Sequence, residues 1–319
     1  MARSIIYSDQ YKPQFSGHET FPLRYGWLKK AADAVSGCKN GAETRKIFLE
    51  EDAISRFGVG RNMVSSIRFW AMATKMICEA SSAGPIELSP MARRILSDNG
   101  LDPFMENPAT LWLIHWELCS NPDRTTWYWF FNHFAGLSFE REDLVSALVA
   151  LADERQWPRV SAATVKRDVE CFVRTYAARP TTASVTGEDI LESPLTELGL
   201  IQATGKKDGF RVVRGPKSSL GEGVFAYALV DFWSKYSDSN TLSFEAIAHE
   251  PGSPGRVFLL DENELAERLS DIEETTAGAI QWSETAGLKQ LLRRAQVPTE
   301  NALTFLELDY RVHDKMEAA

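Results

Sequence analysis

Hydrophobic residues recur at helical spacing shortly after the start of the chain. Four of them fall on one face of a helix: Leu23, Trp27, Ala31 and Val35. We expect this helix to begin after Thr20, whose hydroxyl can cap the first turn, and to run to about Val35. Pro22 lies near the first turn, where its missing N–H leaves no hydrogen bond unmade. The pattern therefore predicts an amphipathic helix directly behind residues 15–20.

The next pattern is a short helix, a glycine turn and a longer helix. Residues 50–57 predict the short helix, Gly58 and Gly60 break it, and residues 61–77 predict the longer one. The apolar face of the longer helix holds Val64, Ile67, Trp70, Ala71, Thr74 and Ile77. Its opposite face holds Arg61, Asn62, Ser65, Ser66, Arg68 and Lys75. A polar and basic outer face on the second helix is typical of a helix-turn-helix that binds DNA.

A small β-hairpin is expected after these helices. Residues 86–88 predict a strand, and Ser89 is expected to cap a helix that ends at Leu96. Two helices followed by a hairpin predict a winged helix, whose second helix lies in the major groove of DNA. A helical hairpin inside an ordinary core is the alternative. A further alternative is that Asn62 caps the longer helix instead of contacting a base.

The middle of the chain predicts helices around an aromatic core. Residues 111–116 and 127–131 are almost wholly apolar, and His115 and His133 accompany them. We expect both histidines to be core residues, because base-stacking aromatics usually line a basic groove and this stretch is acidic. A further helix covers residues 162–178, and Ser161 is expected to cap it. Its outer face has three cations: Lys166, Arg167 and Arg174. That face is either a second DNA contact or a solvated surface.

The residues 179–184 are rich in turn formers and predict a linker. Beyond it we expect these elements: a hairpin from residues 194–200 and 210–213, a tight turn at residues 252–255, and helices over residues 223–236 and 262–274. Asp261, with Glu264 three residues later, is expected to cap the last of these helices. The predicted fold is mainly α with small β-hairpins, an α+β chain of two domains with winged-helix or helix-turn-helix units. The predicted divisions are residues 1–100 (winged-helix DNA-binding region), 101–180 (aromatic-rich helical region of the same domain) and 185–319 (acidic, winged-helix-like domain).

Charge is distributed unevenly along the 319 residues. The net charge is −9, but residues 1–100 hold 14 Lys and Arg against 10 Asp and Glu, and residues 181–319 are strongly acidic. A phosphate-binding surface needs a local positive field, so nucleic acid is expected on the N-terminal third. The four cysteines are far apart, which favours buried reduced thiols over a metal knuckle. No apolar run is long enough for a membrane span, so we expect a cytoplasmic protein without a membrane contact.

One cluster of polar residues could carry chemistry. His18 and Glu19 stand beside the predicted helix start, and three cations follow them: Arg24, Lys29 and Lys30. Imidazole and carboxylate can bind a divalent metal or move a proton while cations hold phosphate. The plainer interpretation is that Glu19 stabilises the helix N-terminus and pairs with Arg24. Four other acids are candidate metal ligands: Asp52, Asp98, Asp102 and Glu106.

Several long motifs resemble those of the SspB family. They are FSGHETFPLRYGWLKK (residues 15–30), FGVGRNMVSSIRFW (57–70), DPFMENPATLWLIHW (102–116), TTWYWFFNHF (125–134), SPLTELGLI (193–201) and SPGRVFLL (253–260). The resemblance covers most of the chain, from about residue 15 to about residue 269.

The resemblance implies a component of a DNA phosphorothioation system used in antiphage defence. Such systems replace a non-bridging phosphate oxygen with sulfur, and SspB-type members are thought to nick one strand for the insertion. The implied partners are DNA, an ATP-pyrophosphatase-like sulfurtransferase and an ATPase; a homodimer is a further candidate assembly. The implied activity is that of a metal-dependent nickase using Mg²⁺ or Mn²⁺, although no familiar nuclease motif is present. A DNA-binding adaptor without catalysis, which recruits the sulfur-transfer enzymes, is the alternative.

On this resemblance, the expected site has two parts. His18 and Glu19 would act as metal ligand or general acid and base. Seven residues would contact DNA: Arg24, Lys29, Lys30, Arg61, Asn62, Ser65 and Arg68.

Overall fold

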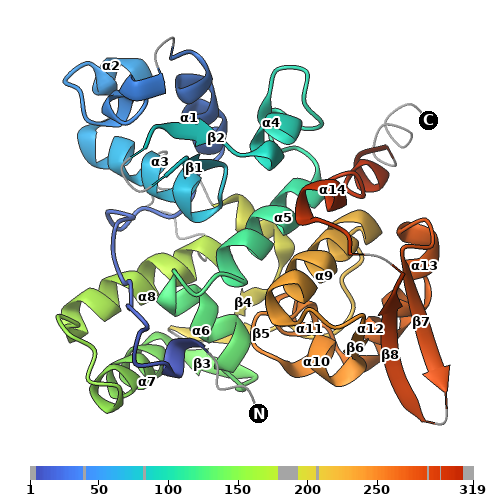
Figure 1. Cartoon of the computed structure of the whole chain (residues 1–319). Coiled ribbons are helices and arrows are strands. Elements are labelled where there is room, and N and C mark those ends of the chain that lie inside the picture. The colour runs from blue at the N-terminus through green and yellow to red at the C-terminus, as the bar shows by residue number, and fades with distance from the viewer. Residues whose placement is uncertain are drawn as a thin grey trace. The chain divides into compact units, whose positions relative to one another are not determined.

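The computed structural model describes residues 5–38, 41–81, 84–178, 193–205, 208–285, 287–294 and 296–311. Helices dominate it, and the strands of the described residues form three small antiparallel sheets (Figure 1). The predicted α+β fold class is therefore confirmed. Contacts divide the chain into two compact units, which are described separately below.

The first unit draws on residues 1–106, 122–127 and 135–213. Its N-terminal elements are the 3₁₀ turns Ile5–Tyr7, Gly41–Glu43 and Lys46–Phe48, then α1 (Trp27–Ser36), α2 (Ala53–Phe57), α3 (Arg61–Ala73), β1 (Ile77–Glu79), β2 (Ile86–Leu88) and α4 (Pro90–Leu96). Helix α1 packs against α3, and β1 pairs with β2. Helix α2 and the 3₁₀ turn Lys46–Phe48 also contact α3. The helix–turn–helix–hairpin order matches the sequence pattern, while a winged helix that binds DNA stays a prediction.

Two helix boundaries differ from those predicted. Helix α1 begins at Trp27, after a left-handed Gly26 with φ 75°, so Thr20 does not cap it. Thr20 itself has φ 64° and lies in the preceding loop. Helix α3 ends at Ala73, because left-handed Lys75 turns the chain out of the helix and Ile77 begins β1. Periodicity alone carried the helix too far, since strand residues at the right spacing extend the same apolar stripe.

The remainder of the first unit is a helix pair and a sheet. The elements are β3 (Ser138–Glu140), α7 (Arg141–Glu154), α8 (Ala162–Tyr176), the 3₁₀ turn Pro194–Leu198, β4 (Ile201–Ala203) and β5 (Gly209–Val212). Strand β5 lies between β3 and β4 and is antiparallel to both. Ser161 caps α8 by accepting the Thr164 N–H, as the sequence predicts. Helices α7 and α8 pack together, which gives α8 a buried face.

The second unit draws on residues 107–121, 128–134 and 214–319. Its elements are α5 (Pro108–Cys119), most of α6 (Thr125–His133), α9 (Glu222–Tyr236), β6 (Thr241–Ser243), α10 (Phe244–His249), α11 (Pro254–Val257), α12 (Glu262–Ser270), α13 (Ile272–Thr275), β7 (Ile280–Thr285), β8 (Leu288–Arg293) and α14 (Thr299–Ala302). Strand β8 is central in this sheet, and β7 and β8 form its long ribbon (Figure 1). Asp261 caps α12, as predicted, although the helix ends at Ser270 rather than near residue 274.

These units do not follow the predicted ranges. Residues 107–121 and 128–134 belong with the C-terminal half, and residues 193–213 belong with the N-terminal half. The reason is that α5 packs against α9, while β5 pairs with β3. The predicted linker, residues 179–184, lies outside the described residues. The division into separate folding domains stays a prediction.

His115 is a core residue, as the sequence predicts. His115 is fully buried, and its Nε2 donates to the carbonyl of Val257 at 2.8 Å. Burial lowers the pKa of His115 to about 4, so the ring is neutral at physiological pH.

Among the cysteines, Cys119 and Cys171 are buried, but Cys78 is exposed and Cys38 is half-buried. The expectation of four buried thiols is wrong for these two. No helix in the described ranges is long and apolar enough to cross a membrane.

Candidate nucleic-acid interface

Residues 15–21 form a loop with an unusual backbone. Gly17, Glu19 and Thr20 have φ values of 114°, 48° and 64°, all in the left-handed region. A Cβ on Gly17 would lie 2.7 Å from the ring of Phe69, a residue of α3. The loop therefore needs glycine here both for its backbone angle and for its close approach to α3. We name residues 15–21 the clamped loop.

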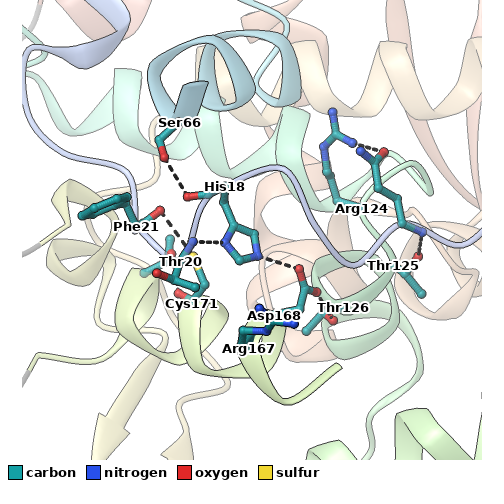
Figure 2. Close-up of polar contacts among 12 residues, drawn as sticks. His18, Thr20, Phe21, Ser66, Arg124, Thr125, Thr126, Arg167, Asp168 and Cys171 are labelled. Atoms are coloured by element: carbon teal, nitrogen blue, oxygen red, sulfur yellow. Dashed lines mark hydrogen bonds and ion pairs between the residues drawn. The ribbon is translucent and has the colours of Figure 1, made fainter. Parts of the chain in front are cut away.

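His18 is the buried centre of the clamped loop, with a relative exposure of 3%. Its Nδ1 accepts the N–H of Thr20 at 2.9 Å, which assigns the proton to Nε2. Nε2 then donates to Oδ1 of Asp168 on α8 at 2.8 Å (Figure 2). Both ring nitrogens are thus engaged within the protein. In this arrangement neither ring nitrogen of His18 is free to bind a metal ion. A catalytic role for His18 stays a prediction.

Two further side chains complete the histidine's surroundings. Thr126 donates its hydroxyl to Oδ2 of Asp168 at 2.5 Å, so both carboxylate oxygens are paired. Ser66 on α3 donates to the carbonyl of His18 at 2.7 Å (Figure 2). Buried polar groups are stable only when paired in this way, because an unpaired one loses its hydration without compensation. The network therefore joins the clamped loop to α3 and to α8.

The other carbonyls of the clamped loop are held as well. The indole N–H of Trp70 donates to the carbonyl of Phe21 at 3.0 Å, and the thiol of Cys171 contacts the same oxygen at 3.4 Å. Arg174 on α8 donates to the carbonyl of Thr20 at 3.2 Å. Because successive carbonyls are bound from two helices, the loop is held on both sides. Its solvent-facing side chains are thereby set in one orientation.

Glu19 is the exposed acid of the clamped loop. It forms no ion pair with Arg24 in the described part of the chain, and it stands well before the start of α1. The guanidinium of Arg24 instead lies 5.6 Å from the ring centres of Phe21 and Trp27. The plainer interpretation of Glu19, as a helix-stabilising partner of Arg24, is therefore wrong. What remains is a carboxylate presented to solvent between His18 and Thr20.

The beginning of α3 lies beside the clamped loop. Gly60 is its N-cap and makes no side-chain capping bond, so Asn62 is already the second helical residue. The alternative in which Asn62 caps the helix is thus wrong. Three of the predicted DNA-contact residues are exposed and Arg68 is half-exposed; the exposed ones are Arg61, Asn62 and Ser65. Ser66, on the other side of the helix, reaches the clamped loop.

The predicted lysines have partners inside the protein. Lys29 donates to Asp33 and Asp98, both at 2.6 Å, and these hydrogen bonds raise its pKa. Lys30 donates to the carbonyl of Phe57 at 2.9 Å. Lys29 is half-buried, whereas Lys30 stays exposed beside its carbonyl partner. A DNA contact by either lysine stays a prediction.

Sequence reasoning missed the residues that hold the clamped loop. Asp168 falls at helical spacing with Val165 and Phe172, on the face predicted to be apolar. A carboxylate at such a position needs a buried partner, and that was the available signal. Arg124 was missed too: its guanidinium lies 4.8 Å from the ring centre of Phe69 and contacts Gln14. Nothing local marks this role of Arg124, because Phe69 and Gln14 are more than 50 residues away in the chain.

The acidic candidates for a metal site are not brought together. Asp52 pairs with Arg56, Asp98 pairs with Lys29, and Asp102 accepts the N–H of Glu106. Within the described residues, no three His, Cys, Asp or Glu side chains are grouped closely enough to hold an ion. A Mg²⁺ site of another type needs only one or two carboxylates, with water and substrate phosphate completing the shell. Glu19 fits that type, since its carboxylate is exposed.

Comparison with known proteins places the chain. A family model described as "Protein of unknown function (DUF4007)" matches residues 15–310. The chain belongs to this family. The match includes the clamped loop and α3 and extends to the last described turn. The resemblance to the SspB family expected from the motifs is confirmed by solved structures.

Two crystal structures are similar over almost the whole chain. One is magnesium ion-bound SspB, with a TM-score of 0.83, 28% identity and coverage of 97% of this chain and 91% of that one. The other is an SspB crystal structure with a TM-score of 0.77, 29% identity and coverage of 95% and 87%. A comparison with curated proteins gave no match. This DUF4007 member therefore has an SspB-like fold, and the α+β class predicted from the sequence is supported independently.

Proposed function

We propose that this DUF4007 protein is a DNA-binding, strand-nicking component of a DNA phosphorothioation system in antiphage defence. The observation that carries the proposal is the exposed start of α3, held beside the clamped loop by the Ser66 hydrogen bond to His18. The SspB-like structure supports the phosphorothioation context. The protein would work in the cytoplasm with the sulfurtransferase and the ATPase of the system.

The start of α3 suits a phosphate-bearing ligand. Its first N–H groups receive no side-chain cap, and helix N-termini attract anions through these groups and the helix dipole. Arg61 and Asn62 can bridge guanine and adenine edges in the major groove, while Arg68, one turn and more further on, suits a backbone phosphate. Arg174 and Arg124 add positive charge at the clamped loop. These groups together provide a local positive field in a chain that is acidic as a whole.

For nicking, the two candidate catalytic residues take different roles. Glu19 would contribute a carboxylate toward Mg²⁺ or Mn²⁺, which polarises a phosphate and activates water when bound. His18 would position Glu19 by fixing the neighbouring backbone through Asp168 and Thr20. The magnesium ion in a similar SspB structure favours this metal class. The predicted catalytic pair thus becomes one contacting residue and one positioning residue.

A plasmid assay tests nicking directly. The full chain is incubated with supercoiled plasmid and Mg²⁺ or Mn²⁺, and conversion to open circle is measured with and without chelator. We expect Glu19→Gln to abolish conversion while leaving DNA affinity within about twofold. The matched control is Glu142→Gln, because Glu142 is also an exposed acid of the first unit. Nicking by Glu19→Gln at the wild-type rate would exclude the proposed role of Glu19.

The adaptor alternative gives a different result in the same assay. An adaptor would bind duplex DNA but leave the plasmid supercoiled with every metal, including when the partner proteins are added one at a time. DNA binding itself is measured by fluorescence anisotropy over a salt series, where each phosphate contact contributes about −0.9 to the slope. If DNA binding by the full chain did not depend on salt concentration, both the nickase and the adaptor proposal would be contradicted.

A further inference from the structure

A cavity of about 530 Å³ lies within the second unit. Its walls come from the segment after β5, from the end of α10, from α11 and from the start of α12. Two arginines line it: Arg214 and Arg256. Ligand pockets in proteins commonly have volumes of about 300–1,000 Å³, so a small organic molecule fits.

The two arginines are oriented by backbone carbonyls. Nη2 of Arg214 donates to the carbonyl of Phe134 at 3.3 Å, and Nε of Arg256 donates to the carbonyl of His249 at 3.0 Å. Neither guanidinium forms an ion pair with a described Asp or Glu. Each has five N–H donors, so most of its donors remain for a ligand. A guanidinium fixed at one edge presents its other edges in a defined direction.

The acids that line the same cavity are already engaged. Oδ1 of Asp261 accepts the N–H of Glu264 as the cap of α12. Glu262 lies 3.3 Å from Nε2 of His249, which also has Glu245 at 3.6 Å. Both carboxylates add negative charge to the cavity, but neither forms an ion pair with Arg214 or Arg256 among the described residues. The two guanidinium groups therefore keep donors that no carboxylate of the described residues takes.

The two guanidinium groups repel each other, and this repulsion affects the pKa of Arg214. Burial, followed by the positive charge of Arg256, lowers the pKa of the half-buried Arg214. Like charges that share a partly desolvated site repel each other, and an anion between them would remove the repulsion. Binding of an anion between the two guanidinium groups is therefore expected to stabilise the folded protein.

We propose that this cavity binds the phosphate group of a small, nucleotide-sized molecule. Two guanidinium groups match a dianion, and a phosphate monoester carries about two negative charges at neutral pH with three acceptor oxygens. A carboxylate carries only one charge and would leave the pair unbalanced. The volume beyond the arginines accommodates the rest of a mononucleotide. This site is separate from the proposed DNA-binding surface and does not depend on nicking.

The test is binding to the full chain, measured by isothermal titration calorimetry with inorganic phosphate, adenosine monophosphate and adenosine. We expect both phosphate compounds to bind, and adenosine without its phosphate to bind at least 10-fold more weakly. Arg214→Gln and Arg256→Gln should each weaken binding at least 10-fold. Arg294→Gln is the matched control, because Arg294 is an exposed arginine of the second unit outside the cavity.

Thermal melting distinguishes ligand binding from a general structural role. Without ligand, Arg256→Gln should melt at or above the wild-type temperature because a repulsion is removed. With phosphate, the wild type and Arg294→Gln should gain stability and the two cavity variants should not. Absence of binding to the wild type, or binding within twofold in both cavity variants, would overturn the proposal. A loss confined to duplex DNA affinity in these variants would overturn it too, by assigning the arginines to the DNA backbone.

Discussion

Nε2 of His18 lies 2.8 Å from Oδ1 of Asp168, although 150 residues separate them in the chain. Both side chains are almost completely buried, with relative exposures of 3% and 2%. The pair joins the clamped loop to α8, and Thr126 closes the second oxygen of the carboxylate. A short motif near the N-terminus therefore owes its shape to a carboxylate in a distant helix. This relationship is the basis for proposing that His18 positions its neighbours.

Removing the carboxylate should destabilise the first unit. Asp168→Ala leaves the Nε2–H of His18 and the hydroxyl of Thr126 buried without partners. We expect a loss of at least about 2 kcal/mol, since each buried unpaired group costs about 1–3 kcal/mol. Urea unfolding followed by tryptophan fluorescence measures it. The control Asp153→Ala alters an exposed aspartate and should change stability by less than about 0.5 kcal/mol. Equal losses in the two variants would contradict the network.

Substitutions of two glycines in the first unit distinguish the cost of backbone strain from the cost of a steric clash. Gly17 and Gly26 both have positive φ, but only Gly17 faces the ring of Phe69, while nothing lies within 4 Å of a Cβ on Gly26. We expect Gly26→Ala to cost about 1 kcal/mol from backbone strain alone. Gly17→Ala should cost about 1–3 kcal/mol more, because Phe69 must move. Thermal melts of the two variants measure the difference, and equal midpoints would show that Phe69 yields freely.

The glycines before α3 also differ from each other. The sequence pattern predicts positive φ for both, but Gly58 has φ 65° and Gly60 has φ −64° with ψ 160°. Gly58→Ala should therefore cost about 1 kcal/mol. Gly60→Ala should cost less than Gly58→Ala, because Gly60 has an ordinary extended conformation with open space around it and so no backbone strain is added. Chemical denaturation measures the loss of stability in each variant. A larger loss for Gly60→Ala than for Gly58→Ala would contradict the prediction.

Buried His115 predicts a pH dependence of the second unit. Its folded-state pKa of about 4 lies below the ordinary value of 6.5, so the unfolded chain takes up a proton that the folded chain does not. The resulting stability is fully present above pH 6.5 and is lost as the pH falls toward 4, by about 3 kcal/mol. Calorimetric melting between pH 7 and pH 4 measures this slope. His115→Gln should lower stability at pH 7 and flatten the slope; an unchanged slope would assign it to other groups.

The partners of Lys29 predict that the proposed DNA contacts are unequal. Lys29 lies between Asp33 and Asp98, whereas exposed Arg61 has no such partner among the described residues. We expect Arg61→Ala to reduce the salt slope of duplex binding by about 0.9 and to weaken sequence preference. Lys29→Ala should leave both within experimental error. Fluorescence anisotropy on the full chain measures the salt slope and the sequence preference of both variants. Arg294→Ala is the control outside the first unit. A larger loss in Lys29→Ala would place DNA on α1 instead.

Local sequence patterns predicted many of the helix caps and helix starts. Ser89, Ser161 and Asp261 were expected to cap helices, and each accepts the expected N–H, because a cap depends on residues only three positions apart. The starts of α3 and α9 followed from glycine turns and periodicity, to within a residue. The SspB resemblance came from long motifs, which the fold and the family match confirm. What the sequence determined, then, is whatever neighbouring residues decide among themselves.

Tertiary structure decided the state of the candidate site. His18 and Glu19 are adjacent in the chain, yet packing buries the first against Asp168 and leaves the second in solvent. The same distinction separates Lys29, which two acids hold, from Arg61, which is exposed. Arg214 and Arg256 share a cavity only because α11 folds back beside the segment after β5. The sequence by itself determined which chemical groups are present and which helices carry them. Their pairing, burial and availability depend on contacts between distant segments, and these contacts form only when the chain folds.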